Sequence, residues 1–403
     1  MSKLKPRKTL TGYVLAIWLL GIFVVRLYVQ LVFSGQGGMA IAAQAIGVTW
    51  PLVYFIFFGK GFLPREVDSV TLLVLTVFAS SALISCFVSP APFISFGYVL
   101  ATLVGIYVAL MFNSNFRQSD FLHAFKLLSL LGIAMLLAYT KYDYRTYPGY
   151  RLGDGTDTMN PNSVGMITMA CVAAAFAYKS TIFRLLIIIP SLLIIYLTGS
   201  RAAAAATLIT IGIVTWHNFR QSSGAKKLLV FIPLVTFSLS WLVWNWQDFY
   251  ELLNEFFKWD DKHRGLASGA SGRLIVWGWM WDLIKDNFLI GVGFRAHGEF
   301  IQASSAHNGY LALLADIGIF GFSAIAMYVV WRILFLYQCY IRSRAPIAAI
   351  YFGFAVGFLA LAFFERYLLN IGNPGSLMFL LILFLSKKRF ILAVSYKHIA
   401  VRR

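Results

Sequence analysis

Long apolar runs separated by short polar segments dominate the pattern of hydrophobic and polar positions along this chain. We count about twelve runs near the ~20 residues that a bilayer-crossing helix needs. Their approximate limits are 10–33, 39–58, 68–89, 92–112, 121–140, 162–178, 182–198, 201–217, 227–247, 306–331, 346–367 and 371–386. The pattern predicts an all-α polytopic membrane protein in which residues 1–403 form a single integral membrane domain.

One large loop interrupts this succession of spans. Residues 248–305 form the only connection of any size on the predicted outer side. Within it, the stretch 273–288 carries three tryptophans beside charged residues. Tryptophan-rich amphipathic helices lie in the plane of the membrane interface. We therefore expect the loop to carry an interfacial amphipathic helix.

Composition and charge agree with a membrane protein. Hydrophobic residues make up 60% of the chain and charged residues only 12%, which no soluble domain of this size needs. The formal net charge is +18, and 22 of the 34 Lys and Arg residues fall on one side of the predicted spans. Because basic loops stay in the cytoplasm, we place that side and both chain termini there. The charge therefore reflects topology, and no nucleic-acid partner is expected.

The segment after residue 303 predicts the start of a long helix. Ser304 and Ser305 are good N-cap residues, so we expect a helix from about Ala306 through the predicted span. Apolar residues recur along it at helical spacing on one face. Gly318 and Gly321 share that face, where small residues let another helix approach closely.

His307 and Asn308 stand at the head of this predicted helix. His307 would lie on the packed face, one turn inside the helix. The positive end of the helix dipole disfavours the imidazolium form there, and a neutral imidazole can act as a general base. The alternative is a histidine that only packs or caps. Asn308 is a candidate to line the same cavity.

Two arginines open predicted helices on the outer side. Arg201 follows Ser200, a predicted N-cap, and Arg273 follows Gly272. An arginine in a first helical turn is electrostatically misplaced because the helix N-terminus is already positive. Two such residues on the same side suggest a bound anion, since helix N-termini and guanidinium groups together bind phosphate. The alternative for each is an interfacial arginine that snorkels to the lipid headgroups.

Three further charged residues are candidates to line this cavity. Arg26 lies within the first span, where a charge marks a functional site unless it snorkels outward. Glu365 and Arg366 close the eleventh predicted span and form either a local ion pair or part of the cavity wall. Asp260 and Asp261 are better interpreted as solvated loop charges than as a metal pair. The sequence contains no HExxH or CxxC motif, so it predicts neither a metal nor a cofactor.

Residues 307–321 read HNGYLALLADIGIFG. This sequence resembles the His-Asn…Gly-x-x-Gly signature of the O-antigen ligase and polysaccharide polymerase superfamily. The resemblance extends, in the same order, to the sequences around Arg201, Arg273 and the 291–294 turn. It implies a multi-spanning glycosyltransferase of the bacterial inner membrane that uses undecaprenyl-diphosphate-linked glycans at the periplasmic face, in cell-surface polysaccharide biosynthesis.

Roles follow from the resemblance position by position. Arg201 and Arg273 would bind the donor diphosphate, and His307 would activate the acceptor hydroxyl, without metal or nucleotide. The implied partners are the bilayer, the lipid-linked donor, and an acceptor that is either a second lipid-linked glycan or lipid A–core. A flippase and a chain-length regulator would act beside the enzyme. We expect the anomeric configuration to invert, because attack comes from the face opposite the diphosphate.

Several functions stay open at this point. Ala205 departs from a leucine that some ligases carry four residues after an arginine, and the outer face has no broad basic platform for a phosphorylated core. Both observations favour a polymerase over a ligase. A transporter or lipid-glycan flippase is the alternative from another class, although transporters place charged residues near the bilayer midplane. A non-catalytic assembly partner would leave the two arginines and the histidine unexplained.

Overall fold

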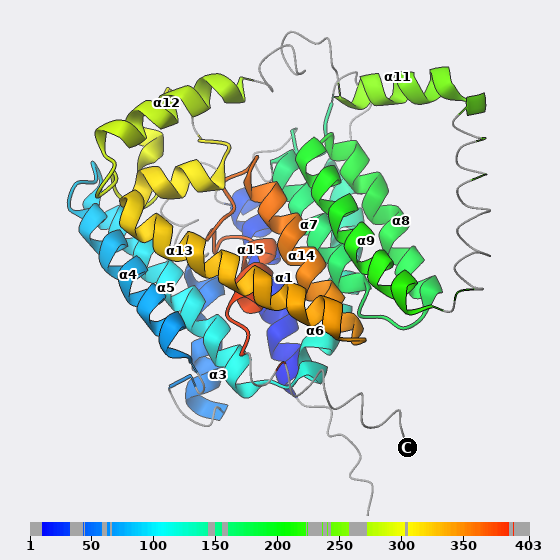
Figure 1. Ribbon diagram of the computed structural model, residues 1–403, viewed down its shortest axis with the longest axis horizontal. Coiled ribbons are helices and arrows are strands. Elements are labelled where there is room, and N and C mark those ends of the chain that lie inside the picture. The colour runs from blue at the N-terminus through cyan, green and yellow to red at the C-terminus, as the bar shows by residue number, and fades with distance from the viewer. Residues whose placement is uncertain are drawn as a thin grey trace, which may run out of the picture.

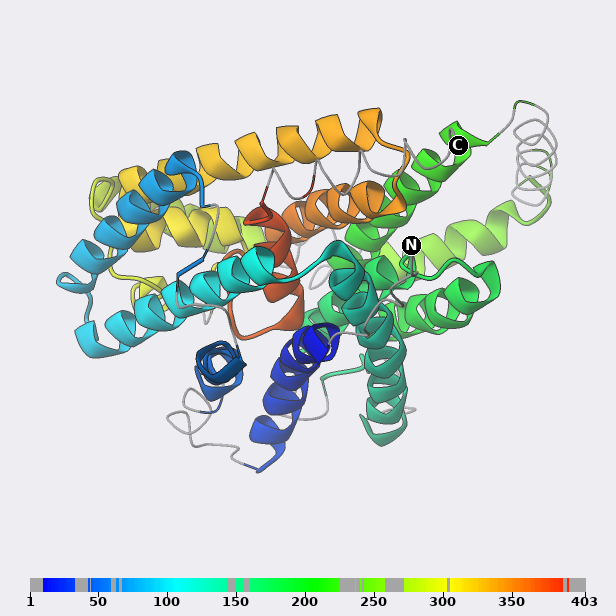
Figure 2. The same ribbon diagram turned by 90° about the horizontal axis from the view of Figure 1, so that it is seen from below.

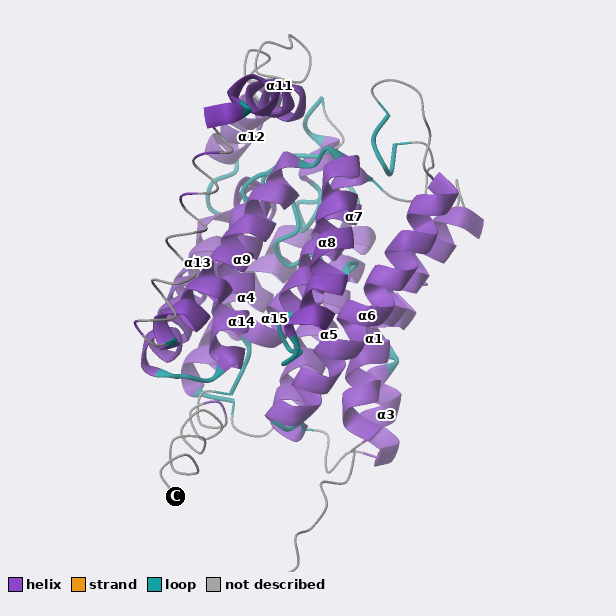
Figure 3. Ribbon diagram, turned by 90° about the vertical axis from the view of Figure 1, so that its right-hand side faces the viewer, coloured by secondary structure: helices purple, strands orange, loops and turns teal. Residues whose placement is uncertain are grey.

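The computed structural model shows an all-helical protein (Figure 1). It describes residues 10–32, 43, 45–58, 63–64, 67–143, 150–154, 160–222, 224, 236, 240, 243–257, 272–302, 305–386 and 390. Within these ranges every regular element is a helix and no strand occurs (Figure 3). The predicted fold class is therefore confirmed at the level of its architecture.

Most of the helices fall on the predicted apolar runs, whereas α11, α12 and η2 fall mainly in the predicted loop 248–305. They are α1 (Leu10–Val32), α3 (Pro51–Phe58), α4 (Ser69–Cys86), α5 (Pro92–Asn115), α6 (Gln118–Asp143), α7 (Pro161–Ala175), α8 (Thr181–Thr198), α9 (Arg201–Gln221), α11 (Trp246–Phe257), α12 (Arg273–Asp286), the short 3-10 helix η2 (His297–Glu299), α13 (Gly309–Arg342), α14 (Pro346–Ala362) and α15 (Pro374–Leu383).

Six helices of the described part are long and apolar enough to cross a membrane. They are α4, α5, α6, α8, α9 and α13, and five shorter apolar helices accompany them: 12–25, 45–58, α7, α14 and α15. All of these fall on runs that the sequence predicts. Most of the predicted span 227–247 lies outside the described residues, so the count of twelve remains a prediction.

Some helices end at one end of the bundle, and others begin at the opposite end. At one end the last turns of α9 and α13 meet, where Arg220 donates a hydrogen bond of 3.2 Å to the Ile341 carbonyl. The first residues of α7, α9, α12 and α13 lie at the opposite end, which we call the site end. There α11 and α12 lie across the bundle (Figures 1 and 3).

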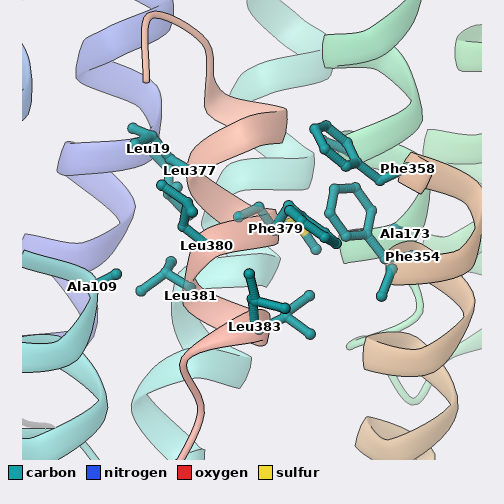
Figure 4. Packing of buried hydrophobic residues seen from close by; sticks show 14 of the residues in the cluster. Leu19, Ala109, Ala173, Phe354, Phe358, Leu377, Phe379, Leu380, Leu381 and Leu383 are labelled. Atoms are coloured by element: carbon teal, nitrogen blue, oxygen red, sulfur yellow. The ribbon is translucent and has the colours of Figure 1, made fainter. Parts of the chain in front are cut away.

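The core is built around α15, which is surrounded by longer helices (Figure 2). All ten of its residues are buried, and ten residues span only about 15 Å, too little to cross a bilayer alone. Leu19 of α1, Ala109 of α5 and Ala173 of α7 lie around it (Figure 4). The Phe358 ring of α14 stacks on Phe379 of α15 at 4.7 Å. The buried position of α15 thus replaces contact with lipid by contact with other helices.

The chain between α14 and α15, residues 363–373, is irregular although much of it is buried. Irregular backbone at membrane depth is tolerated only where the protein itself satisfies its polar groups. Ser376 Oγ donates to the Tyr367 carbonyl at 2.7 Å, and the Tyr367 hydroxyl lies 3.1 Å from Ser163 Oγ. The helix predicted over 346–367 therefore ends five residues early.

The predicted helix after residue 306 is also not continuous, because α13 is broken at Gly318. This glycine has φ 65° and ψ −176°, a conformation that is essentially restricted to glycine, and a Cβ there would collide with the Leu289 carbonyl. The freed backbone binds the preceding loop, since Ile319 N–H donates to the Phe288 carbonyl at 2.9 Å. Of the two glycines, Gly321 is the one that allows another helix to pack closely, as predicted. A Cβ at Gly321 would come within 2.8 Å of Ser81 in α4.

Candidate active site

His307 does not lie inside α13 as predicted, but in the turn that precedes it. Asn308 caps the helix, with its side-chain oxygen accepting from Tyr310 N–H at 2.9 Å and Leu311 N–H at 3.0 Å. The helix therefore starts at Gly309 rather than near residue 306. His307 has φ 48°, a left-handed conformation uncommon for a non-glycine residue. The prediction was wrong because the Asn308 side chain accepts from two helix N–H groups and so takes the cap position.

Glu365 joins the candidate residues of the site end. Its side chain is only 7% exposed, and its Oε1 accepts from Arg273 Nη2 at 2.8 Å and from Asn162 Nδ2 at 2.6 Å. Its other oxygen, Oε2, lies 3.9 Å from His307 Nδ1. That distance exceeds a hydrogen bond, although catalytic contacts are often longer before substrate binds. One carboxylate thus connects four segments that are distant in sequence.

Arg273 opens α12, as the sequence predicts. Its guanidinium group carries the ion pair with Glu365 and lies 5.8 Å from the Phe364 ring centre. Gly272 occupies the cap position with φ 77° and offers no side chain to the helix N–H groups. The anion that the sequence led us to expect is therefore supplied in part by the protein itself, through Glu365.

The helix predicted over 273–288 is confirmed as α12, which ends at Asp286. Trp281 is 51% exposed and Trp279 is 37% exposed. Trp277 packs against the Phe363 ring at 5.5 Å, and its indole nitrogen is buried without a hydrogen-bond partner among the described residues. This unsatisfied donor lies one turn after Arg273 on the same helix face.

Arg201 opens α9 at the same end of the bundle. The residue before it, Ser200, holds the predicted N-cap position, but its side chain makes no capping hydrogen bond. The Ser200 hydroxyl is buried without a partner among the residues that the structure describes. A Cβ at Gly165 of α7 would lie 3.3 Å from the Ser200 Cβ, and Gly165 follows Asn162 by about one helical turn. Helix α7 thus contacts both the start of α9 and Glu365.

Arg151 is a site-end cation that the sequence did not single out. Its Nε donates to the Thr198 carbonyl at 2.8 Å, and it packs beside Gly199 in the turn between α8 and α9. Gly199 has φ 56°, as is usual where a helix ends in a glycine. No motif predicted this contact, because residue 151 lies in a polar segment without regular spacing.

Arg366 points into a different group of residues from its neighbour Glu365. Its Nη1 lies 3.5 Å from His297 Nε2, and His297 Nδ1 lies 2.8 Å from Asp316 Oδ1. Glu365 and Arg366 therefore form no local ion pair with each other in the structure. His297 and Asp316 were not among the predicted site residues, although Asp316 lies within the 307–321 signature and His297 lies ten residues before it.

Two earlier candidates cannot be placed. The side chain of Arg26 lies outside the part of the chain whose side chains are described, although its backbone belongs to α1. Asp260 and Asp261 lie outside the described residues altogether. Asn308 is 3% exposed, and both of its described hydrogen bonds cap α13, so the geometry gives it a structural role beside His307.

This arrangement brings together groups suited to acid–base chemistry on an anionic substrate. An imidazole and a carboxylate lie 3.9 Å apart, which resembles the way that a carboxylate orients a histidine base in other enzymes. A guanidinium group shares the carboxylate, and buried polar atoms of Ser200, Trp277 and His307 have no hydrogen-bond partner within the described part of the chain. Buried polar groups without partners are costly, so a ligand that satisfies them is favoured.

Comparison with known proteins bears on the same residues. Residues 186–326 match a family described as O-antigen ligase, which confirms the resemblance to the O-antigen ligase and polymerase superfamily over that segment. The match includes Arg201, Arg273 and His307 but not Asn162 or Glu365. No curated protein matches the chain. The family match supports glycan transfer of the ligase or polymerase type.

Proposed function

We propose that the protein is a membrane glycosyltransferase that transfers a glycan from an undecaprenyl-diphosphate-linked donor to an acceptor sugar hydroxyl at the periplasmic face. The observation that carries this proposal is the Glu365 carboxylate, which binds Arg273 and lies 3.9 Å from His307. It unites the donor-binding and base candidates that are 34 residues apart in the chain.

The donor diphosphate binds between Arg201 and Arg273. Both residues open helices at the site end, and helix N-termini present N–H groups to anions. The unsatisfied Ser200 hydroxyl and Trp277 indole N–H are further donors for phosphate oxygens. Arg273 can bind the diphosphate and keep its contact with Glu365, because a guanidinium group has five N–H donors and the Glu365 contact uses only Nη2.

His307 acts as the general base. Its imidazole accepts the proton of the acceptor hydroxyl while that oxygen forms a bond to the anomeric carbon of the donor. The bond from that carbon to the diphosphate oxygen breaks, and the electron pair leaves with the diphosphate. Arg201 and Arg273 stabilise the charge that develops there, and Glu365 stabilises the imidazolium. Attack opposite the leaving group inverts the anomeric configuration, and no metal takes part.

In the proposed topology the chain crosses the membrane about twelve times, because the sequence has about twelve apolar runs near the ~20 residues that a span needs. Both chain termini lie in the cytoplasm, and residues 248–305 form a large periplasmic loop whose helix α12 lies at headgroup depth. The bias of basic residues toward the opposite side supports this orientation. It puts Arg273 level with the diphosphate of a lipid whose chain lies in the bilayer.

We favour a polymerase, for which the acceptor is a second lipid-linked glycan. Ala205 and the lack of a broad basic platform in the sequence support this choice. A ligase that uses lipid A–core is the second candidate, because the matched family is described as O-antigen ligase. A flippase and a chain-length regulator are expected partners of the polymerase.

The test uses purified full-length protein in detergent with a lipid-linked oligosaccharide donor. Arg201→Ala and Arg273→Ala should abolish both donor binding and transfer, and lysine should restore only part because it lacks the bidentate fork. His307→Ala should lower the rate on the order of 10²–10⁴-fold while donor still binds. Product formed in micelles argues against a transporter, because a micelle has no two compartments. Full transfer activity in the His307 variant would refute the proposed base.

A further inference from the structure

A second polar cleft lies beside the candidate active site. It is open to solvent on one side, and its lining includes Arg295, His297, Gly309, Asp316 and Arg366. Gly309 ties this cleft to the first site, since it is the residue after Asn308 and packs against the Glu365 carbonyl, where a Cβ would lie 3.2 Å away. The two neighbours Glu365 and Arg366 therefore face two adjoining sites.

A buried chain of polar groups holds Arg366 in this cleft. Asp316 Oδ1 lies 2.8 Å from His297 Nδ1 and also accepts from the His297 backbone N–H at 3.2 Å. His297 is 1% exposed and Asp316 is 4% exposed. A carboxylate accepts and a guanidinium donates, so the His297 ring carries its proton on Nδ1 and accepts from Arg366 at Nε2, at 3.5 Å.

Arg366 differs from Arg273 in how it meets its nearest carboxylate. Arg273 is paired directly with a carboxylate at 2.8 Å, whereas the His297 ring lies between Arg366 and Asp316. Among the described residues Arg366 forms no ion pair with an acid. Arg295 adds a second guanidinium group to the lining, where it lies 4.7 Å from the Tyr98 ring centre. The described lining of the cleft thus includes two arginines and one carboxylic acid.

The backbone around the cleft is strained. Arg295 has φ 64° and Leu369 has φ 55°, and both line the cleft. A non-glycine residue in the left-handed region costs on the order of 1–3 kcal/mol and tends to occur at functional sites. The strain at Arg295 aims a charged side chain at the same cavity that Arg366 enters from another segment.

We propose that this cleft binds a phosphate group of the acceptor glycolipid. The inference rests on the proposed function, in which His307 receives an acceptor beside the donor. Both acceptors considered above carry phosphate, as the diphosphate of a lipid-linked glycan or as the phosphates of lipid A–core. Arg366, held by His297 and Asp316, binds that phosphate through charge-assisted hydrogen bonds and sets the distance of the acceptor hydroxyl from His307.

The experiment counts lipids bound to the purified full-length protein by native mass spectrometry. One arm titrates undecaprenyl diphosphate, and the other adds phosphorylated lipid A–core to protein already holding one undecaprenyl diphosphate. We expect a second lipid to bind in one arm, which identifies the acceptor. Arg366→Ala should weaken that second binding about 10- to 100-fold, the range for a hydrogen bond to a charged group, and leave the first unchanged. Arg366→Lys should weaken it less.

Matched variants separate this proposal from the donor site. Lys285→Ala removes a cation from exposed α12, where Lys285 pairs only with Asp282 at 3.1 Å among the described residues, and should bind both lipids normally. Arg273→Ala should lose the first lipid and keep the second; if it keeps both, the donor site is wrong and the cleft stands. Wild-type binding of both lipids by Arg366→Ala, or no second lipid in either arm, would overturn the acceptor cleft. Thermal unfolding of each variant shows that it is folded, and Arg366→Lys replaces Arg366→Ala if the latter is not.

Discussion

The Glu365→Gln substitution isolates the charge at the centre of the candidate active site. Glutamine has the same size, and its side-chain oxygen still accepts from Asn162 or Arg273, which now bond at 2.6 Å and 2.8 Å. The substitution removes the negative charge that lies 3.9 Å from His307 Nδ1. We therefore expect it to act mainly on the step in which the imidazole gains a proton.

The expected size of the effect follows from that distance. Two unit charges about 4 Å apart interact by about 4 kcal/mol at an effective dielectric constant of about 20. His307 is 36% exposed, so solvent screens part of this energy, and about 2 kcal/mol is a reasonable share. A loss of about 2 kcal/mol in the transition state corresponds to a fall of about 30-fold in kcat.

The assay measures transfer and donor binding separately in the purified enzyme. Single-turnover transfer from a radiolabelled lipid-linked donor gives the rate, and equilibrium binding of the same donor gives its affinity. Donor binding should be unchanged or tighter, because Arg273 no longer shares its charge with a carboxylate. Glu299→Gln is the matched control, since Glu299 is exposed and lies at the same end of the protein in η2.

Two results would contradict this reasoning. An unchanged kcat in Glu365→Gln would mean that the carboxylate does not stabilise the imidazolium. A loss of donor affinity as large as the loss of rate would mean that Glu365 acts by positioning Arg273 instead. Thermal unfolding should show a folded variant, because Arg273 is 20% exposed and can turn to solvent.

Three further predictions concern topology, folding and the acceptor. Cysteine at position 154 should react with a membrane-impermeant thiol reagent in spheroplasts and cysteine at position 344 should not, since both positions are exposed; the reverse would invert the orientation. Gly318→Ala should prevent stable folding or lower the melting temperature strongly, whereas Gly212→Ala, with open space around its Cβ position, should not. One lipid-linked repeat unit alone should yield a ladder of longer products, and transfer seen only after lipid A–core is added would identify a ligase.

The sequence alone determined the fold class and most helix positions. Apolar runs near 20 residues require bilayer burial and internal backbone hydrogen bonding, which only helices provide locally. Ten of the helices begin within about three residues of the predicted limits, a usual error for such boundaries, and α12 also begins at the predicted Arg273. Arg201, Arg273 and His307 could be named as candidates because motif and helix-end chemistry are local properties of the chain.

Only the tertiary structure decided how these residues meet. The helix end at Ala362 and the break at Gly318 depend on partners supplied by other segments: Tyr367 and Ser376 in one case, and the 288–289 backbone in the other. No periodicity reveals such partners. His307 lies before α13 because Asn308 is the N-cap residue. Several neighbouring residues here can cap a helix, and propensity alone does not decide which of them does.

The central position of Glu365 could not be predicted for the same physical reason. Its contacts reach residues 58, 92 and 203 positions away in the chain, and a buried carboxylate requires partners that only folding brings within bonding distance. The same reason applies to the contacts among His297, Asp316 and Arg366. His297 and Asp316 come before α14 in the sequence, and Arg366 comes after it. Local sequence fixes which groups can bind phosphate or take a proton, and the packing of distant segments fixes which of them share a charge.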